Sequence, residues 1–166
     1  MANLYIMAGL PASGKSTFTK LYCKSKTMIV VSSDEIRECL YGDPNEQGDP
    51  NEVFAYVDSI TYDTLKYGID VIYDATSLTK AIRENIIKKF EDVTESIHLI
   101  WMNTPFEECL SRNFTRDRHV PYDVMVSMNE RLEMPTKDER FTTISIITNE
   151  DCTYIEPYEE IEIIED

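Results

Sequence analysis

The amino-acid sequence predicts an α/β protein whose mainly parallel five-stranded sheet is flanked by helices. Short apolar runs rich in β-branched residues alternate with longer amphipathic segments, as in chains built from strand–helix–strand units. The runs are apolar at consecutive positions, so both faces of each strand should be covered. We expect the strands at residues 4–8, 28–32, 69–73, 97–102 and 143–148.

Six amphipathic segments are predicted to be helices, and two of them carry clear end signals. Gly68 is suited to cap the C-terminus of the third helix. Thr104 and Pro105 supply an N-cap and a proline at the first helical position of the fifth. The expected helices cover residues 15–24, 34–41, 52–67, 79–90, 105–116 and 121–132.

Residues 42–52, GDPNEQGDPNE, interrupt this alternation. Two Asp-Pro-Asn turns and two glycines predict a loop. This loop is either a solvated connector or the mobile rim of a substrate cleft, since long loops often carry functional residues.

Charge and length limit the function classes. The chain has 166 residues and a net charge of −15, which argues against a protein that coats nucleic acid or an anionic membrane. Residues 149–166 hold eight of the acids and no Lys or Arg, so residues 1–148 carry a net charge of only −7. We expect one domain at 1–148, followed by an acidic tail that either adds an edge strand at 161–164 or remains loose.

Neither the cysteines nor the N-terminus indicates export or a membrane. The four cysteines form no CxxC pair and have no nearby His to complete a zinc site. The first ten residues lack a basic region, and no stretch approaches the roughly 18 apolar residues of a membrane span. A soluble cytoplasmic protein is therefore expected.

The strongest motif, GLPASGKST, joins the first predicted strand to the first predicted helix and satisfies G-x-x-x-x-G-K-[ST]. In such a P-loop, consecutive backbone N–H groups point at a phosphate, and the helix N-terminus adds its positive dipole end. Lys15 should bridge the β- and γ-phosphates of ATP, while the Ser16 hydroxyl binds Mg²⁺. The expected nucleotide-binding residues of this loop are Gly9, Leu10, Pro11, Ala12, Ser13, Gly14, Lys15, Ser16 and Thr17.

The second predicted strand leads into Asp34, and Arg37 follows one helical turn later. Ligands of open parallel sheets bind beyond the carboxyl ends of the strands, where the P-loop also lies. Asp34 can accept the proton of an attacking hydroxyl or hold Mg²⁺ through water, and Arg37 can bind an anion beside it. The structural alternative is that Asp34 only caps a helix and Arg37 only pairs with a surface acid.

The third predicted strand closes on Asp74, which is the Walker B pattern. Its carboxylate would face either Mg²⁺ or the acceptor hydroxyl, and the sequence leaves open whether Asp34 or Asp74 lies nearer the metal. Asp74 and Thr76 are therefore candidate substrate-binding residues.

Residues 112–119 form the densest basic stretch of the chain. Arg112 and Arg116, four positions apart, would share one face of a helix. They are predicted to belong to a helical lid, at about 105–133, that closes over the triphosphate, with Arg116 stabilising charge on the transferring phosphoryl group. The alternative is that these cations only stabilise a helix C-terminus.

The GLPASGKST, SSDEIR, DATS and RNFTRDRHVPYDVMVSM segments occur in an order that resembles the kinase domain of phage-type and bacterial polynucleotide 5′-kinases. The chain is also similar to the broader group of small predicted P-loop kinases, and the resemblance covers residues 4–148. It implies a P-loop kinase fold with a helical lid, with Lys15 and Ser16 at the phosphates and Mg²⁺.

On the acceptor side, the resemblance implies that Asp34 is the general base for a 5′-hydroxyl and that Arg37 binds an acceptor phosphate. It also implies that Asp74 contacts the acceptor end or the metal, that Arg112 contacts the nucleotide phosphates, and that Arg116 is the lid arginine.

The expected function is transfer of the γ-phosphoryl group of Mg·ATP to a hydroxyl, most readily the 5′-hydroxyl of DNA or RNA. A kinase of sugars, nucleosides or nucleotide-sugars is the first alternative. A P-loop module that binds or hydrolyses ATP without an acceptor is the second.

Overall fold

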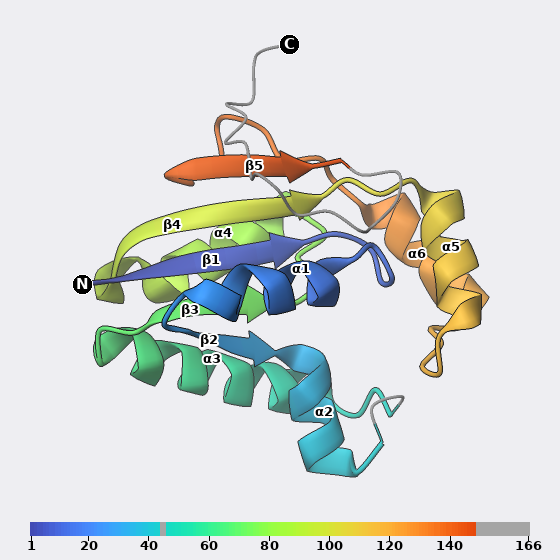
Figure 1. Ribbon diagram of the computed structural model, residues 1–166, viewed down its shortest axis with the longest axis horizontal. Coiled ribbons are helices and arrows are strands. Elements are labelled where there is room, and N and C mark those ends of the chain that lie inside the picture. The colour runs from blue at the N-terminus through green and yellow to red at the C-terminus, as the bar shows by residue number, and fades with distance from the viewer. Residues whose placement is uncertain (44–45, 149–166) are drawn as a thin grey trace.

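The computed structural model describes residues 1–43 and 46–148 and contains one five-stranded sheet in the order β2-β3-β1-β4-β5 (Figure 1). All four neighbouring strand pairs are parallel, which confirms the predicted α/β architecture. The strands are β1 (Ala2–Ala8), β2 (Met28–Ser32), β3 (Asp70–Asp74), β4 (Thr94–Met102) and β5 (Thr143–Ile147).

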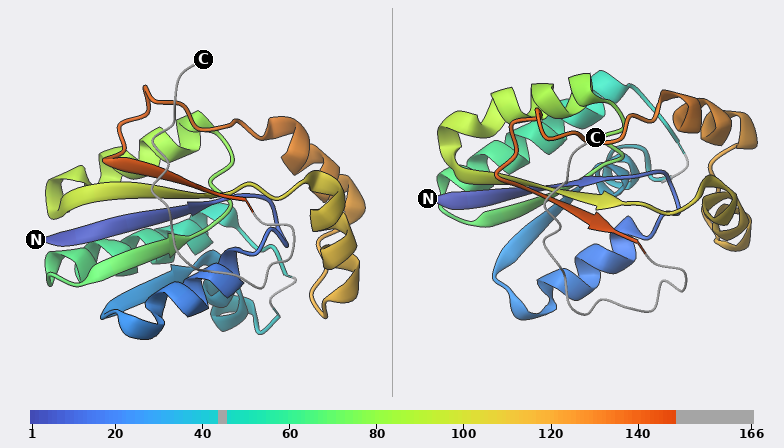
Figure 2. Two further views of the ribbon diagram at one scale, coloured as in Figure 1. Left: turned by 45° about the horizontal axis from the view of Figure 1, so that its top comes forward. Right: turned by 90° about the horizontal axis from the view of Figure 1, so that it is seen from above.

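Helices cover both faces of the sheet. One face carries α1, and the opposite face carries α3 and α4 (Figure 2). A hairpin of α5 and α6 stands beyond the carboxyl ends of the strands, next to the P-loop (Figure 1). The helices are α1 (Lys15–Tyr22), α2 (Ser33–Tyr41), α3 (Pro50–Lys66), α4 (Lys80–Phe90), α5 (Phe106–Thr115) and α6 (Tyr122–Arg131).

The core explains why the strands are apolar at consecutive positions. On the α3–α4 face, Leu4 and Leu99 pack with Val57 of α3 in the larger cluster of buried residues. On the α1 face, Met7 and Phe18 belong to a second cluster. The central strands are therefore desolvated on both sides, and this burial is the main stabilisation of the sheet.

Several predicted boundaries differ from the structure by two or three residues, and those of α3 and β4 have a clear cause or the largest difference. Helix α3 begins at Pro50, so the second DPNE sequence starts a helix and the preceding loop ends at Asp49. The Asp49 side chain accepts a hydrogen bond from the backbone N–H of Asn51 at 2.9 Å, which makes it an N-cap with proline at N1. Strand β4 begins at Thr94, three residues before its predicted start. The predicted edge strand at 161–164 and the tail 149–166 lie outside the described residues.

Among residues 1–43 and 46–148, the structure contains no helix of the length and apolarity that a membrane span requires.

Candidate active site

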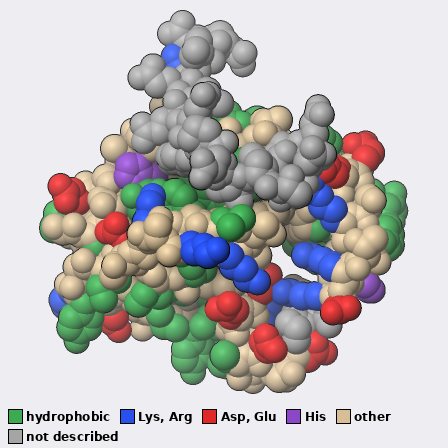
Figure 3. Space-filling view, viewed as in Figure 1, with side chains coloured by type: hydrophobic (Ala, Val, Ile, Leu, Met, Phe, Trp, Pro, Cys, Tyr) green, Lys and Arg blue, Asp and Glu red, His purple; other side chains and the backbone are tan. Residues whose placement is uncertain are grey.

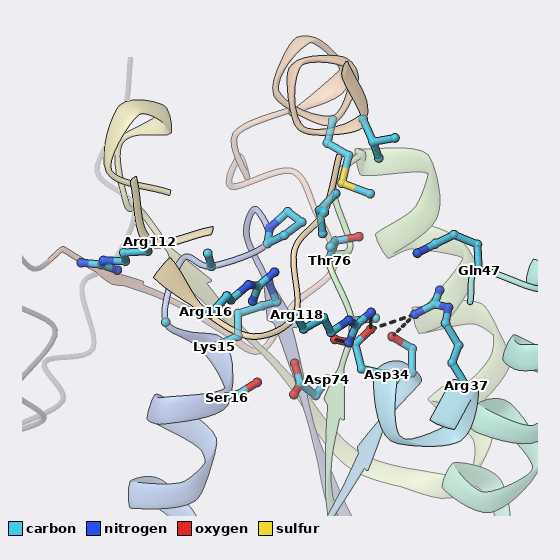
Figure 4. A pocket seen from close by; sticks show the side chains of 18 of the residues that line it. Lys15, Ser16, Asp34, Arg37, Gln47, Asp74, Thr76, Arg112, Arg116 and Arg118 are labelled. Carbon is cyan, nitrogen blue, oxygen red and sulfur yellow. Dashed lines mark hydrogen bonds and ion pairs between the residues drawn. The ribbon is translucent and has the colours of Figure 1, made fainter. Parts of the chain in front are cut away.

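A cavity of about 550 Å³ lies at the carboxyl ends of the strands, between the P-loop, α2, the start of α3 and the α5–α6 hairpin (Figure 4). Lys and Arg side chains gather around this hollow on the molecular surface (Figure 3). Every predicted site residue lines the cavity except Gly9, Leu10 and Ser13, which are buried within the P-loop itself. Sequence motifs separated by up to about a hundred residues therefore meet at one place.

The P-loop backbone has the conformation that its sequence predicts. Gly9 has a φ of 145°, and a Cβ there would lie 2.9 Å from the Ser13 Oγ and 3.0 Å from the Met102 carbonyl oxygen. No side chain fits at this position. The Gly9 N–H donates to the Thr76 carbonyl at 3.0 Å, which ties the P-loop to the turn after β3.

Lys15 points back into the P-loop. Its Nζ donates to the carbonyl oxygens of Gly9 and Leu10, at 2.9 and 2.8 Å. Burial lowers the pKa of Lys15, and the nearby Asp74 carboxylate opposes that shift. The ammonium group is thus held against the backbone of the P-loop by two carbonyl oxygens.

Asp74 ends β3 deep in the cavity and is 7% exposed. Burial raises its pKa to about 6, Lys15 counteracts the shift, and the acids Asp34 and Glu35 add to it. The side chains of Asp74 and Ser16 point into the same part of the cavity (Figure 4). A buried carboxylate and a hydroxyl are oxygen ligands of the type that Mg²⁺ prefers.

These two residues fit a metal that takes its remaining ligands from phosphate and water. In the described part of the chain, no three or more His, Cys, Asp or Glu side chains form a cluster able to hold a metal alone. A Mg²⁺ ion that arrives with a nucleotide matches this sparse set of ligands better than a resident ion does.

Asp34 lines the same cavity at the start of α2, and Figure 4 shows it beside Asp74. Its Oδ1 accepts from Arg37 at 2.9 Å, and its carboxylate also receives two bonds from Arg118, at 2.8 and 2.9 Å. Ser32 caps the helix by accepting from the Glu35 N–H, so capping does not occupy the Asp34 carboxylate. The carboxylate remains half exposed and faces the cavity.

Both predicted lid arginines line the cavity, but their expected helical relationship is wrong. Helix α5 ends at Thr115, and Arg116 has an extended backbone with φ −94° and ψ 155°. Arg112 forms an ion pair with Glu108 one turn earlier, whereas Arg116 donates to the Asn113 Oδ1 at 3.3 Å. Burial and the neighbouring Arg118 lower the pKa of Arg116.

The guanidinium groups of both arginines retain unused donors. The Arg112 Nη1 and the Arg116 Nε are buried and form no hydrogen bond within the described residues. Unused donors on two cations that line the cavity provide capacity to bind an anion.

Sequence analysis missed several residues that line the cavity, among them Arg118 and Gln47. Arg118 could have been predicted as a site residue, because it lies in the basic stretch just after Arg116. Its pairing with Asp34 could not, because the two residues are 84 positions apart and no local pattern links them. Gln47 lines the cavity, so the loop before α3 does reach its rim. The position of this loop favours its interpretation as the rim of a cleft over that of a solvated connector.

The chain is similar to known proteins over most of its length. A family model described as "AAA domain" matches residues 4–135. An L-seryl-tRNA(Sec) kinase of Methanococcus maripaludis is 27% identical over 168 residues, an alignment that covers 95% of this chain and 64% of that protein. The chain thus spans about two thirds of the length of this relative.

Two solved structures show the fold. A chain of the Pnkp1/Rnl/Hen1 RNA repair complex aligns with a TM-score of 0.70 and 23% identity, over 79% of this chain and 44% of that chain. A gluconokinase from Sinorhizobium meliloti aligns with a TM-score of 0.62 and 15% identity, over 89% of this chain and 83% of that chain. The architecture is that of the P-loop kinases.

Proposed function

Since the chain belongs to the AAA domain family and has a P-loop kinase fold, we propose that it transfers the γ-phosphoryl group of ATP to a hydroxyl group. The observation that carries this proposal is the presence of a P-loop and an acceptor-side carboxylate in one cavity, with arginines between them. A module that only binds nucleotide has no need for a carboxylate at the position of Asp34.

On the donor side, the backbone N–H groups at the end of the P-loop and at the N-terminus of α1 would bind the β-phosphate. Lys15 would then turn from its carbonyl partners toward the β- and γ-phosphates. Ser16 and Asp74 would hold Mg²⁺, which neutralises phosphate charge when bound. This proposal places Asp74 nearer the metal and keeps Asp34 for the acceptor.

On the acceptor side, Asp34 would accept the hydroxyl proton as the oxygen attacks the γ-phosphorus. The bond between the γ-phosphorus and the bridging oxygen breaks, and ADP leaves with that oxygen. Arg116 and Arg112, which have unused donors, would stabilise charge on the transferring group. The α5–α6 hairpin would act as the lid that excludes water from this step.

We propose the 5′-hydroxyl end of DNA or RNA as the acceptor. The support is the named RNA context of two similar proteins, a seryl-tRNA kinase and a member of an RNA repair complex. The net charge of −7 over residues 1–148 disfavours a long nucleic-acid track, so a short acceptor end is preferred over a long polymer. Similarity to a gluconokinase supports a small hydroxylated molecule as the second candidate.

The test is incubation with γ-labelled ATP, Mg²⁺ and DNA or RNA oligonucleotides that end in a 5′-hydroxyl. Label should appear on these ends, and matched oligonucleotides with a 5′-phosphate should remain unlabelled. Phosphorylation of sugars or nucleosides alone would establish the second candidate instead. ATP hydrolysis that no acceptor changes would overturn the transfer proposal.

A further inference from the structure

The connection between α5 and α6 supplies an arginine to each side of the cavity. Arg116 lies beside Lys15 on the donor side, while Arg118, two residues later, reaches Asp34 on the acceptor side (Figure 4). One short loop therefore contacts both halves of the site. A shift of this loop would move both cations together.

Asn113 holds the loop in this shape. Its side chain is 1% exposed, donates to the Val120 carbonyl at 2.7 Å and accepts from the Val120 N–H at 2.9 Å. The same Oδ1 accepts from Arg116 at 3.3 Å. A buried amide with these bonds closes the loop and restricts where its arginines can point.

The Arg118 guanidinium contacts both oxygens of the Asp34 carboxylate. Its Nη1 lies 2.8 Å from Oδ2, and its Nη2 donates to Oδ1 at 2.9 Å. Arg37 donates to the same Oδ1 at 2.9 Å. Each carboxylate oxygen has two lone pairs, so Oδ1 is fully used and Oδ2 keeps one lone pair.

We propose that Arg118 is a positioning residue that orients Asp34 so that Oδ2 accepts the proton of the acceptor hydroxyl. This inference rests on the proposed phosphoryl transfer. The loop between α5 and α6 would bring Arg116 to the phosphoryl donor and, through Arg118, orient the Asp34 carboxylate. A single movement of this loop would therefore place both groups. A two-point guanidinium contact sets the plane of the carboxylate in a way that a lysine cannot.

Stabilisation of the fold does not explain the ion pair between Asp34 and Arg118. The Asp34 side chain is 53% exposed and that of Arg118 is 22% exposed, and ion pairs in contact with solvent add little to the free energy of unfolding. We therefore expect Arg118→Ala to leave the urea midpoint unchanged while it changes turnover.

The kinetic test compares Arg118→Ala, Arg118→Lys and the control Arg131→Ala, using any acceptor that the wild-type protein phosphorylates. Arg131 is an exposed residue of α6 that does not line the cavity. We expect kcat to fall about 10- to 100-fold in Arg118→Ala, with the KM for ATP within about twofold of wild type. Arg118→Lys should recover only part of the loss, and the control should behave as wild type.

Two further measurements separate positioning from direct binding. In an Asp34→Asn background, Arg118→Ala should cause no additional loss of residual turnover, because the two residues act as one unit. Hydrogen exchange measured by mass spectrometry should speed up over residues 113–121 in both Arg118→Ala and Asp34→Asn, with or without substrate. Unchanged exchange in both variants would show that the pair does not hold the loop, and would overturn the inference.

The outcomes also distinguish this inference from the proposed function. Transfer by wild-type protein with an unchanged kcat in Arg118→Ala would overturn the role of Arg118 alone. A rise in the KM for ATP at constant kcat would overturn it too, because Arg118 would then bind the donor directly. Absence of transfer to every acceptor would overturn the proposed function and the positioning role that rests on it.

Discussion

Arg83 and Glu139 form a buried two-point ion pair that joins α4 to the segment before β5. The Arg83 Nε lies 2.6 Å from Oε1 and its Nη2 lies 3.1 Å from Oε2, with side chains 0% and 7% exposed. The guanidinium also donates to the carbonyl oxygens of Ser77 and Leu78, in the turn after β3. That turn includes Thr76, the backbone partner of the P-loop, so the pair supports the cavity from behind.

Removal of one member of this pair should strongly destabilise the protein. In Glu139→Gln, the buried Arg83 guanidinium loses its charged partner, which we expect to lower the free energy of unfolding by about 3–5 kcal/mol in urea titrations. Arg140→Ala is the matched control, since Arg140 forms ion pairs with Glu84 and Glu91 at the surface and should leave the midpoint nearly unchanged. The double variant Arg83→Leu/Glu139→Leu should recover much of the loss. Equal midpoints for Glu139→Gln and the control would contradict a structural role for the pair.

Lys15→Ala should weaken nucleotide binding without harming the fold. The ammonium group is buried, its pKa is lowered by that burial, and its hydrogen-bond partners are backbone carbonyls, so its loss removes a desolvated charge. We expect the Kd for Mg·ATP, measured by calorimetry, to rise about 10- to 100-fold. Lys20→Ala, an exposed lysine of α1, serves as the control. Wild-type affinity in Lys15→Ala would remove Lys15 from the phosphate site.

Asp34→Asn should separate chemistry from nucleotide binding. The amide keeps the size of the side chain but cannot accept the hydroxyl proton, so kcat should fall by about 10²- to 10⁴-fold. The Kd for Mg·ATP should stay close to that of wild type, because the proposed mechanism assigns Asp34 to the acceptor and leaves nucleotide binding to the P-loop. Asp63→Asn, on the exposed surface of α3, provides a matched control. Substantial transfer by Asp34→Asn would show that another group is the base.

Asp74→Asn should change the free energy of unfolding by an amount that depends on pH. Burial raises its pKa from 3.8 to about 6, so between these values the folded chain binds a proton that the unfolded chain has released. The contribution of Asp74 to stability is therefore greatest below about pH 4 and is lost as the pH rises through about 6, by up to about 3 kcal/mol. In nucleotide-free protein, Asp74→Asn should unfold at higher urea than wild type at pH 7.5, with a smaller difference at pH 5.

Asp74→Asn also removes the attraction between Asp74 and Lys15, which reduces the expected increase in the free energy of unfolding. The increase should still be larger at pH 7.5 than at pH 5. If the wild-type protein is more stable than Asp74→Asn at pH 7.5, burial does not destabilise the charged carboxylate of Asp74, and the prediction is wrong. The same substitution should weaken Mg²⁺-dependent ATP binding, so stability and function would change in opposite directions.

Features that depend on local backbone chemistry were predictable from the sequence. The P-loop between a strand and a helix is one case, because glycine requirements and helix capping act over a few residues. The start of α3 at Pro50 was missed although its signal is also local, because Asp49 supplies an N-cap and is followed directly by a proline and an amphipathic segment.

Side-chain pairs between distant segments were not predictable. Arg83 and Glu139 are 56 positions apart, and Asp34 and Arg118 are 84 positions apart. In sequence, such residues look like ordinary members of polar helix faces and loops. Only the packing of α4 and the placement of the α5–α6 loop decide which carboxylate each arginine meets.

The central place of β1 in the sheet has a consequence for how the protein folds. Asn3 bonds to Asp70 and to Ser96, partners 67 and 93 positions away, because β1 lies between β3 and β4. Such distant pairings slow folding, and the cavity is complete only when both have formed. A chain in which β1 is not yet paired on both sides therefore lacks the full set of residues that line the cavity. Under the proposed function, ATP would favour the complete fold and shift the folding equilibrium toward it by mass action.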